Sequence, residues 1–140
     1  MNTLLIEQTH VITSTAPGKL FQSSVVCFQD CFYIILHVPA STFHVNEHPE
    51  KGYNFGDRSI AEGLKDIIAS CSDETELKSK LGALVQNNTL IINFSEYKKV
   101  KIKGFLGVKT LKASNSALSY VSFNATKDVA KQLVAFYPNL

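Results

Sequence analysis

The sequence predicts a single α+β domain of seven antiparallel strands, with a helix at its C-terminal end and a helical hairpin inserted between the third and fourth strands. Most of the chain consists of short runs in which apolar and polar residues alternate, separated by polar or glycine-bearing turns, as in antiparallel strands. Two other regions place apolar residues three or four positions apart, which indicates helices. The 140 residues, of which 45% are hydrophobic, can form one core and favour one domain spanning 1–140.

The first three strands are predicted at Thr3–Thr13, Leu20–Phe28 and Cys31–Val38. These runs are rich in β-branched and aromatic residues, and turns at 15–18 and at Gln29-Asp30 separate them. The third strand is almost wholly apolar, as expected of a strand in the centre of a sheet.

The segment Pro39–Gly56 is predicted to be a loop, because its eighteen residues include two prolines and two glycines and show no period. Loops this long inside a compact domain are uncommon and are either functional or disordered. His44 and His48 therefore belong to a candidate binding surface. Alternatively, the aromatic residues Tyr53 and Phe55 fix the loop to the core.

A helical insertion is predicted over about 57–87. Ser59 and Glu62 have the spacing of a capping box, and Asp73 and Glu76 can cap a second helix in the same way. Each helix has one apolar stripe, formed in the first by Ile60, Leu64, Ile67, Ile68 and Cys71 and in the second by Leu77, Leu81, Leu84 and Val85.

The last fifty residues are predicted to form a meander of four short strands followed by a helix. The strands are expected at Thr89–Phe94, Lys98–Lys103, Gly107–Ala113 and Ala117–Phe123. The helix starts at about Thr126, capped by Thr126 or Asn124, and ends before Pro138. Its apolar stripe comprises Val129, Leu133, Phe136 and Tyr137, with Val134 alongside, and we expect it to pack on the meander or plug its open end.

This arrangement resembles the pleckstrin-homology-like (PH-like) superfamily, in particular its GRAM and bacterial PH-like groups. The resemblance rests on four parts of the sequence: Thr89-Leu90-Ile91-Ile92-Asn93-Phe94, Tyr97 with Val100, the hairpin Lys-Ile-Lys-Gly-Phe-Leu-Gly at 101–107, and the final strand and helix over 117–137. The resemblance implies a seven-stranded antiparallel barrel or sandwich of two nearly orthogonal sheets, closed by the C-terminal helix. It also implies binding of phosphoinositides or proteins.

The clearest candidate surface is the basic stretch Lys98–Lys103. Alternation places Lys99, Lys101 and Lys103 on one face of a strand, with Val100 and Ile102 on the other. A symmetrical turn at Phe105-Leu106 would put Lys99 opposite Lys112 and Lys101 opposite Thr110. Like charges directly opposite are unfavourable unless they are solvated or bind an anion.

We therefore predict a ligand-binding surface at this hairpin and the long loop. Phe105 and Leu106, at the hairpin tip between two glycines, could contact a partner or a membrane. The alternative is a solvated face whose lysines discourage pairing at the sheet edge. The predicted ligand-binding residues are Lys99, Lys101, Lys103, Lys112, Phe105, Leu106, His44 and His48.

Cys27, Cys31, His44 and His48 match the spacing of a Cys2His2 zinc finger. A finger needs a helix leading into the histidines, whereas 32–38 is β-rich and Pro39 would interrupt a helix. A two-residue turn at Gln29-Asp30 would also pair Cys27 with Phe32, so the two cysteines would face opposite sides of the sheet. We therefore predict no metal site. A small enzyme or metal-binding protein that uses these four residues is the alternative.

The remaining features favour a non-catalytic binding module without a cofactor. The sequence has no nucleophile elbow or phosphate-binding glycine loop. A net charge of +2 argues against nucleic-acid binding. The longest apolar run, Cys31–Val38, is too short to span a membrane, residues 1–10 lack a secretory pattern, and the odd number of cysteines favours free thiols. We expect a cytoplasmic protein that binds a protein partner or, peripherally, an anionic membrane surface; its oligomeric state stays open.

Overall fold

The computed structural model describes residues 1–37, 55, 58–85, 87–105 and 107–140. Within these residues, three helices and seven strands follow the predicted order, and two single turns of 3-10 helix, η3 (Asn88–Leu90) and η4 (Phe94–Glu96), flank the fourth strand. The strands are β1 (Leu4–Thr13), β2 (Phe21–Cys27), β3 (Cys31–Leu36), β4 (Ile91–Asn93), β5 (Lys99–Phe105), β6 (Val108–Ser116) and β7 (Ser119–Thr126); the helices are α1 (Ile60–Ser70), α2 (Glu74–Val85) and α3 (Lys127–Phe136).

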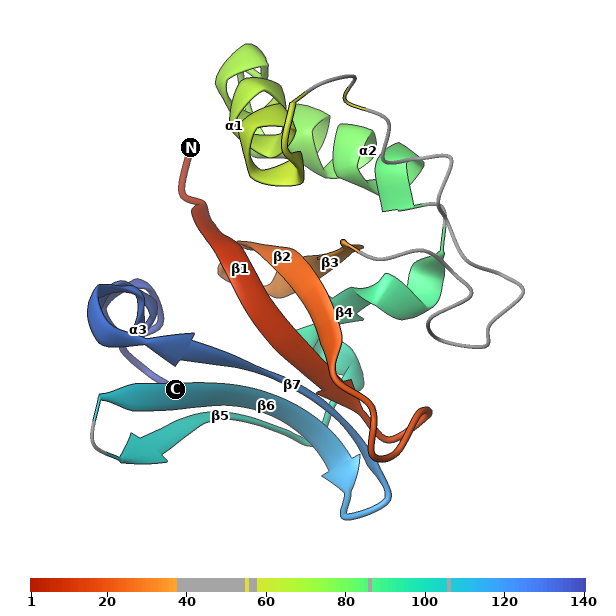
Figure 1. Ribbon diagram of the computed structural model, residues 1–140, viewed down its shortest axis with the longest axis vertical. Coiled ribbons are helices and arrows are strands. Elements are labelled where there is room, and N and C mark those ends of the chain that lie inside the picture. Colours follow the sequence, from red (N-terminus) through yellow and green to blue (C-terminus); the bar gives the residue numbers. More distant parts are fainter. Residues whose placement is uncertain (38–54, 56–57, 86, 106) are drawn as a thin grey trace.

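All seven strands belong to one antiparallel sheet with the order β4-β3-β2-β1-β7-β6-β5. The sheet curls into a half barrel, with the β1–β3 half and the β5–β7 half facing each other (Figure 1). The predicted fold class is confirmed, including the C-terminal helix and the helical hairpin between β3 and β4. The family resemblance implies two nearly orthogonal sheets, whereas the seven strands form one continuous sheet that curves.

The predicted four-stranded meander is wrong in its first strand. β5, β6 and β7 form a meander, but β4 pairs with β3, with Asn93 opposite Cys31, and so lies at the other edge of the sheet. The amide of Phe94 donates to the carbonyl oxygen of Asp30, 3.0 Å away, which holds the end of β4 beside the β2–β3 turn. The chain then turns through η4 and crosses to the opposite edge.

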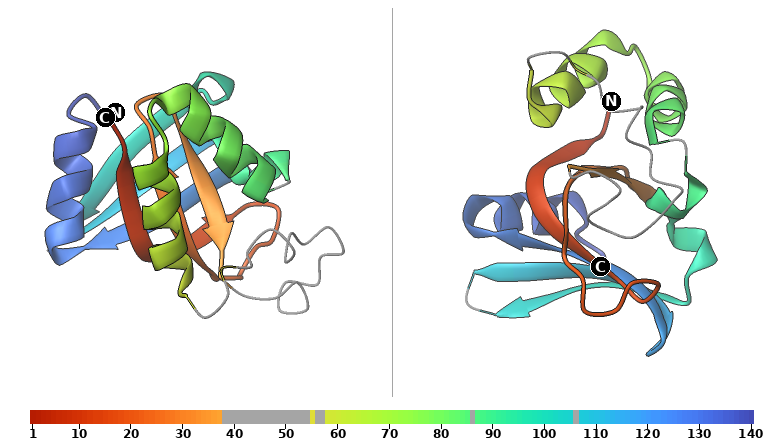
Figure 2. Two further views of the ribbon diagram at one scale, coloured as in Figure 1. Left: turned by 90° about the horizontal axis from the view of Figure 1, so that it is seen from above. Right: turned by 45° about the vertical axis from the view of Figure 1, so that its right-hand side comes forward.

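Two apolar cores lie on opposite sides of β2 and β3. The inner core lies inside the half barrel and includes residues of α3. The outer core joins α1 and α2 to the convex side of the sheet, where Figure 2 shows both helices. Every residue of β3 is buried, because each of its faces contacts one of these cores. The largest fully buried side chains of the inner core are Ile6, Val25, Phe32, Ile34, Leu111, Phe123 and Leu133, and those of the outer core are Phe28, Ile35, Leu64, Leu77 and Leu81.

The two predicted capping interactions of the helical hairpin are confirmed. The Ser59 hydroxyl accepts a hydrogen bond from the amide of Glu62 at 3.1 Å, and the Asp73 carboxylate accepts one from the amide of Glu76 at 2.8 Å. Each bond satisfies a backbone donor in the first helical turn. Lys78 of α2 also contacts the carboxylate of Asp30, which ties this helix to the β2–β3 turn.

The start of α3 differs from the prediction. Thr126 occupies the N-cap position, but its side chain makes no capping hydrogen bond, and the side-chain oxygen of Asn124 accepts from the Thr110 hydroxyl instead. The chain enters the helix through Lys127, whose positive φ of 52° lets its amide donate to the carbonyl oxygen of Gly107. Val134 was expected beside the apolar stripe, but it is 42% exposed.

Candidate binding sites

Lys99, Lys101 and Lys103 project from the outer side of β5, and all three are exposed. Their neighbours Val100 and Ile102 pack against the inner core, as the alternation predicts. We call the exposed surface formed by these three lysines and Lys112 of β6 the basic face.

The predicted register of this hairpin is wrong by two residues. Lys101 lies opposite Lys112, while Lys99 lies opposite Ser114 and Lys103 opposite Thr110. The reason is the position of the turn: Phe105 pairs with Val108, and Gly107 adopts a positive φ of 84° that suits glycine. A shift of two residues preserves the face on which each side chain lies, so the lysines remain together.

The helical hairpin leaves the basic face open. α1 and α2 cover the outer side of β2 and β3, and the outer core contains no residue of β5, β6 or β7 among the described residues. Figures 1 and 2 show the two helices on the far side of the molecule from β5 and β6. Within the basic face, the ammonium group of Lys112 lies 4.5 Å from the centre of the Tyr120 ring, a cation–π distance.

The strands that carry the basic face contain no acidic residue. The segment 97–127 contains seven lysines and no aspartate or glutamate. Among the described residues, the ion pairs involve Arg58, Lys65, Lys78 and Lys80, and none involves a lysine of the basic face. The sequence alone shows this segment of positive charge, which is longer than the basic stretch at 98–103 and includes it.

Of the four other predicted site residues, the structure describes the position of Phe105. Phe105 lies in β5 rather than at the tip of the hairpin, because it pairs with Val108. Val108 is itself 40% exposed, so it provides apolar surface beside the turn. Leu106, His44 and His48 lie outside the described residues.

Phe55 is the described residue of the predicted loop, and it is half-buried. Its ring lies against Gly63 of α1 so closely that a Cβ atom at this position would overlap it. This contact agrees with an aromatic side chain that fixes the chain before α1 to the helix.

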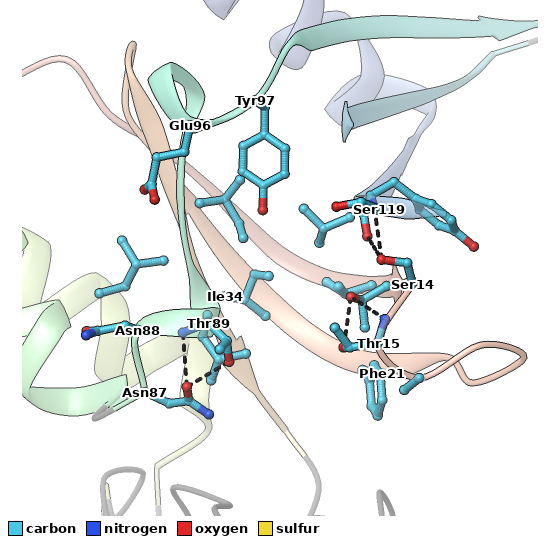
Figure 3. Close-up of a pocket in the computed structure, with 18 of the residues that line it drawn as sticks. Ser14, Thr15, Phe21, Ile34, Asn87, Asn88, Thr89, Glu96, Tyr97 and Ser119 are labelled. Atoms are coloured by element: carbon cyan, nitrogen blue, oxygen red, sulfur yellow. Dashed lines mark hydrogen bonds between the residues drawn. The ribbon is translucent and has the colours of Figure 1, made fainter. Parts of the chain in front are cut away.

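A second candidate site is a cavity of about 760 Å³ whose lining includes residues of the β1–β2 connection, the end of β6 and the start of β7. Figure 1 shows these parts at the end of the half barrel away from α3. We call the cavity the open-end pocket; it was not predicted from the sequence. Its apolar floor continues the inner core and consists of Val11, Phe21, Ile34, Leu36, Ile92 and Val121 (Figure 3).

Polar side chains surround the mouth of the pocket, and most are held by hydrogen bonds. The Ser14 hydroxyl accepts from the amide of Tyr120 at 3.0 Å, and the Asn87 side-chain oxygen accepts from the Thr89 hydroxyl at 2.7 Å. The Asn93 amide group donates to Glu96 at 2.8 Å. These bonds fix the rim without any ligand.

Tyr97 extends its hydroxyl group into the open-end pocket (Figure 3). The side chain is half-buried, and its hydroxyl makes no hydrogen bond with another described residue. Burial, together with the nearby carboxylate of Glu96, raises the pKa of Tyr97, so the group remains a neutral hydrogen-bond donor. Glu96 is the charged side chain of the pocket lining.

The two cysteines of the zinc-finger spacing lie in different cores. Cys27 pairs with Phe32, as predicted, and belongs to the inner core, whereas Cys31 belongs to the outer core. Burial raises the pKa of each thiol to about 12, which disfavours the thiolate that binds metals or acts as a nucleophile. In the described part of the chain, no three His, Cys, Asp or Glu residues are grouped as metal ligands.

His37 follows β3 and is half-buried. Its Nε2 lies 2.6 Å from the Ser24 hydroxyl, which donates to the carbonyl oxygen of Glu7 at 2.7 Å. The single hydroxyl hydrogen of Ser24 is donated to Glu7, so the hydrogen in the contact with His37 must come from Nε2. His37 therefore does not accept the proton of Ser24, as a general base would. Burial lowers the pKa of His37, which favours the neutral ring.

Comparisons with protein-family models, with curated proteins and with solved structures gave no match. In the described part of the chain, no helix has both the length and the apolar character needed to cross a membrane.

Proposed function

We propose that the chain is a non-catalytic binding module that recognises an acidic, extended segment of a protein partner through the basic face. We also propose that it is a divergent member of the PH-like superfamily. The seven-stranded curled sheet and its C-terminal helix support this relationship.

The observation that carries the proposed function is the pairing of Lys101 with Lys112 on strands that contain no carboxylate. Two like charges directly opposite each other destabilise a strand pair, and an acidic ligand converts this repulsion into attraction. Lys99 and Lys103 lie two residues on either side of Lys101, about 7 Å away along the strand, and extend the positive charge in a row.

The position of β5 favours a peptide as the source of the negative charge. β5 is the last strand of the sheet and pairs only with β6 among the described strands. An edge strand presents unpaired backbone N–H and C=O groups, so an extended peptide can add to it as a further strand. Side chains at alternate positions of that peptide would lie beside the lysine row, whereas a lipid surface would leave the backbone groups unused.

A charge-reversal experiment tests the proposal. The probe is a fluorescein-labelled peptide of alternating glutamate and threonine, with a lysine–threonine peptide as its control, and binding is measured by fluorescence anisotropy. We expect K101E/K103E to weaken binding of the acidic peptide by at least about tenfold. K65E/K80E, which makes the same change in net charge on the helical hairpin, should retain most of the affinity.

The same proteins are then tested with vesicles of phosphatidylcholine alone and with added phosphatidylserine. Equal peptide affinity of the two double variants would contradict the proposal. Binding to anionic vesicles without binding to the peptide would also contradict it and would support a lipid headgroup as the ligand.

A further inference from the structure

We propose that the open-end pocket is a second binding site, for an uncharged amphipathic small molecule with a hydrocarbon body and a hydroxyl or carbonyl head group. The site is separate from the basic face, because the pocket opens inside the half barrel while the four lysines lie on its outer side.

The shape of the fold explains why a cavity exists at this end. The inner core fills one end of the half barrel. It includes Ala130 and Leu133 of α3, and Tyr137, which directly follows this helix. At the other end, the curled sheet continues past the core, and the cavity of about 760 Å³ remains. Pockets for small molecules are typically about 300–1,000 Å³, so the open-end pocket can hold most of such a ligand.

The lining determines the chemistry of the body and the head. The floor consists of buried aliphatic and aromatic side chains, which favour a hydrocarbon group. The rim provides hydroxyl and carboxamide groups, several of which are already fixed by the bonds of Ser14, Asn87 and Asn93. The Tyr97 hydroxyl extends from this rim into the cavity and can donate to an oxygen of the ligand (Figure 3).

The charge of the lining selects against an anion. Glu96 contributes a negative charge, and none of the described residues that line the pocket is a lysine or an arginine. A carboxylate or phosphate that entered it would lose water without gaining a counter-charge and would approach Glu96. The pocket and the basic face therefore select ligands of different charge.

The experiment compares two probes that share a hydrocarbon chain, the neutral 1-decanoylglycerol and the anionic decanoate. Each is titrated below its aggregation concentration into isotopically labelled full-length protein, and amide shifts are followed by NMR. We expect saturable shifts at Ser14, Ile34, Ile92 and Val121 with 1-decanoylglycerol, and at least about tenfold weaker binding of decanoate.

Three variants test the named residues. Tyr97→Phe should weaken binding of 1-decanoylglycerol about fivefold, the loss of one hydrogen bond, while Tyr33→Phe in the outer core leaves it unchanged. Glu96→Gln should reduce the preference for the neutral probe over decanoate. K101E/K103E should bind 1-decanoylglycerol as the unmodified chain does, since it alters a different site.

Several results would overturn the inference. One is the absence of saturable shifts at the pocket lining with 1-decanoylglycerol. Another is decanoate binding as tightly as the neutral probe to the unmodified chain. A third is an unchanged affinity of Tyr97→Phe in a protein whose amide spectrum shows that it is folded.

Discussion

At the residue scale, Cys27 shows how burial controls chemistry in this chain. Its side chain is fully buried in the inner core near Tyr137, whose hydroxyl donates to the carbonyl oxygen of Phe28 at 2.5 Å. A thiolate there would lose its hydration, and this cost raises the pKa of Cys27 to about 12, although the contact with Tyr137 opposes the shift. The residue is consequently part of the core.

The raised pKa predicts a loss of stability at alkaline pH. An unfolded thiol ionises near pH 9, whereas the folded Cys27 keeps its proton until about pH 12, so the unfolded state binds fewer protons within this window. The free energy of unfolding should therefore fall above pH 9, by up to about 1.4 kcal/mol per pH unit for this thiol. Urea unfolding under reducing conditions between pH 7 and 10 measures this slope.

Cys27→Val is the matched variant, because valine fills similar space and cannot ionise. It should show a shallower loss of stability above pH 9 than the unmodified chain. Some dependence should remain, because burial raises the pKa of Cys31 in the same direction. Identical slopes for the two proteins would show that Cys27 ionises as freely in the folded state as in the unfolded state.

At the element scale, the two helices of the insertion respond differently to the same substitution. Gly63 in α1 faces the ring of Phe55, whereas Gly82 in α2 has open space where a Cβ would lie. Alanine stabilises a helix by about 0.5–1 kcal/mol relative to glycine when it meets no obstacle. Gly82→Ala should therefore stabilise the protein, and Gly63→Ala should destabilise it because the Phe55 ring must move.

The two glycine variants serve as controls for each other in thermal unfolding. Stabilisation by both substitutions would mean that Phe55 does not pack against α1. Destabilisation by both would mean that the exposed side of α2 has a neighbour beyond the described residues.

The elements themselves could be predicted because their signals are local. The capping residues Ser59 and Asp73 lie within three positions of the amides that they satisfy, and each strand and helix has its own period. The pairing of β4 with β3 could not be predicted, because it joins Asn93 to Cys31 far along the chain. The register of the β5–β6 hairpin depended on which residues form the turn, and only the backbone conformation of Gly107 settles it.

The candidate sites differ in the same way. The lysines of the basic face occupy alternate positions of one strand or lie across the same hairpin, so alternation alone placed them on one side. The open-end pocket is lined by residues from both halves of the sheet and from the segments before and after β4. Its lining has no local pattern, because curvature of the sheet brings these residues together. Tyr97 was recognised for its place in the family resemblance, and its position in the pocket required the fold.

At the scale of the whole molecule, charge is divided between the two sides of the sheet. On the side of the helical hairpin, Arg58 and Lys78 form ion pairs with nearby carboxylates. The half formed by β5, β6 and β7 has lysines and no carboxylates, and no described helix of the insertion packs on it. The insertion thus covers one convex surface and leaves the other available for a partner.

The most direct measurement is a map of amide shifts in labelled protein titrated with the alternating glutamate–threonine peptide at low and high salt. We predict shifts concentrated in Lys99–Lys103 and around Lys112, which disappear at high salt because the Debye length falls from about 10 Å at 0.1 M to about 3 Å at 1 M. Shifts centred on α1 and α2, or the same shifts with the lysine–threonine peptide, would contradict a binding function of the basic face.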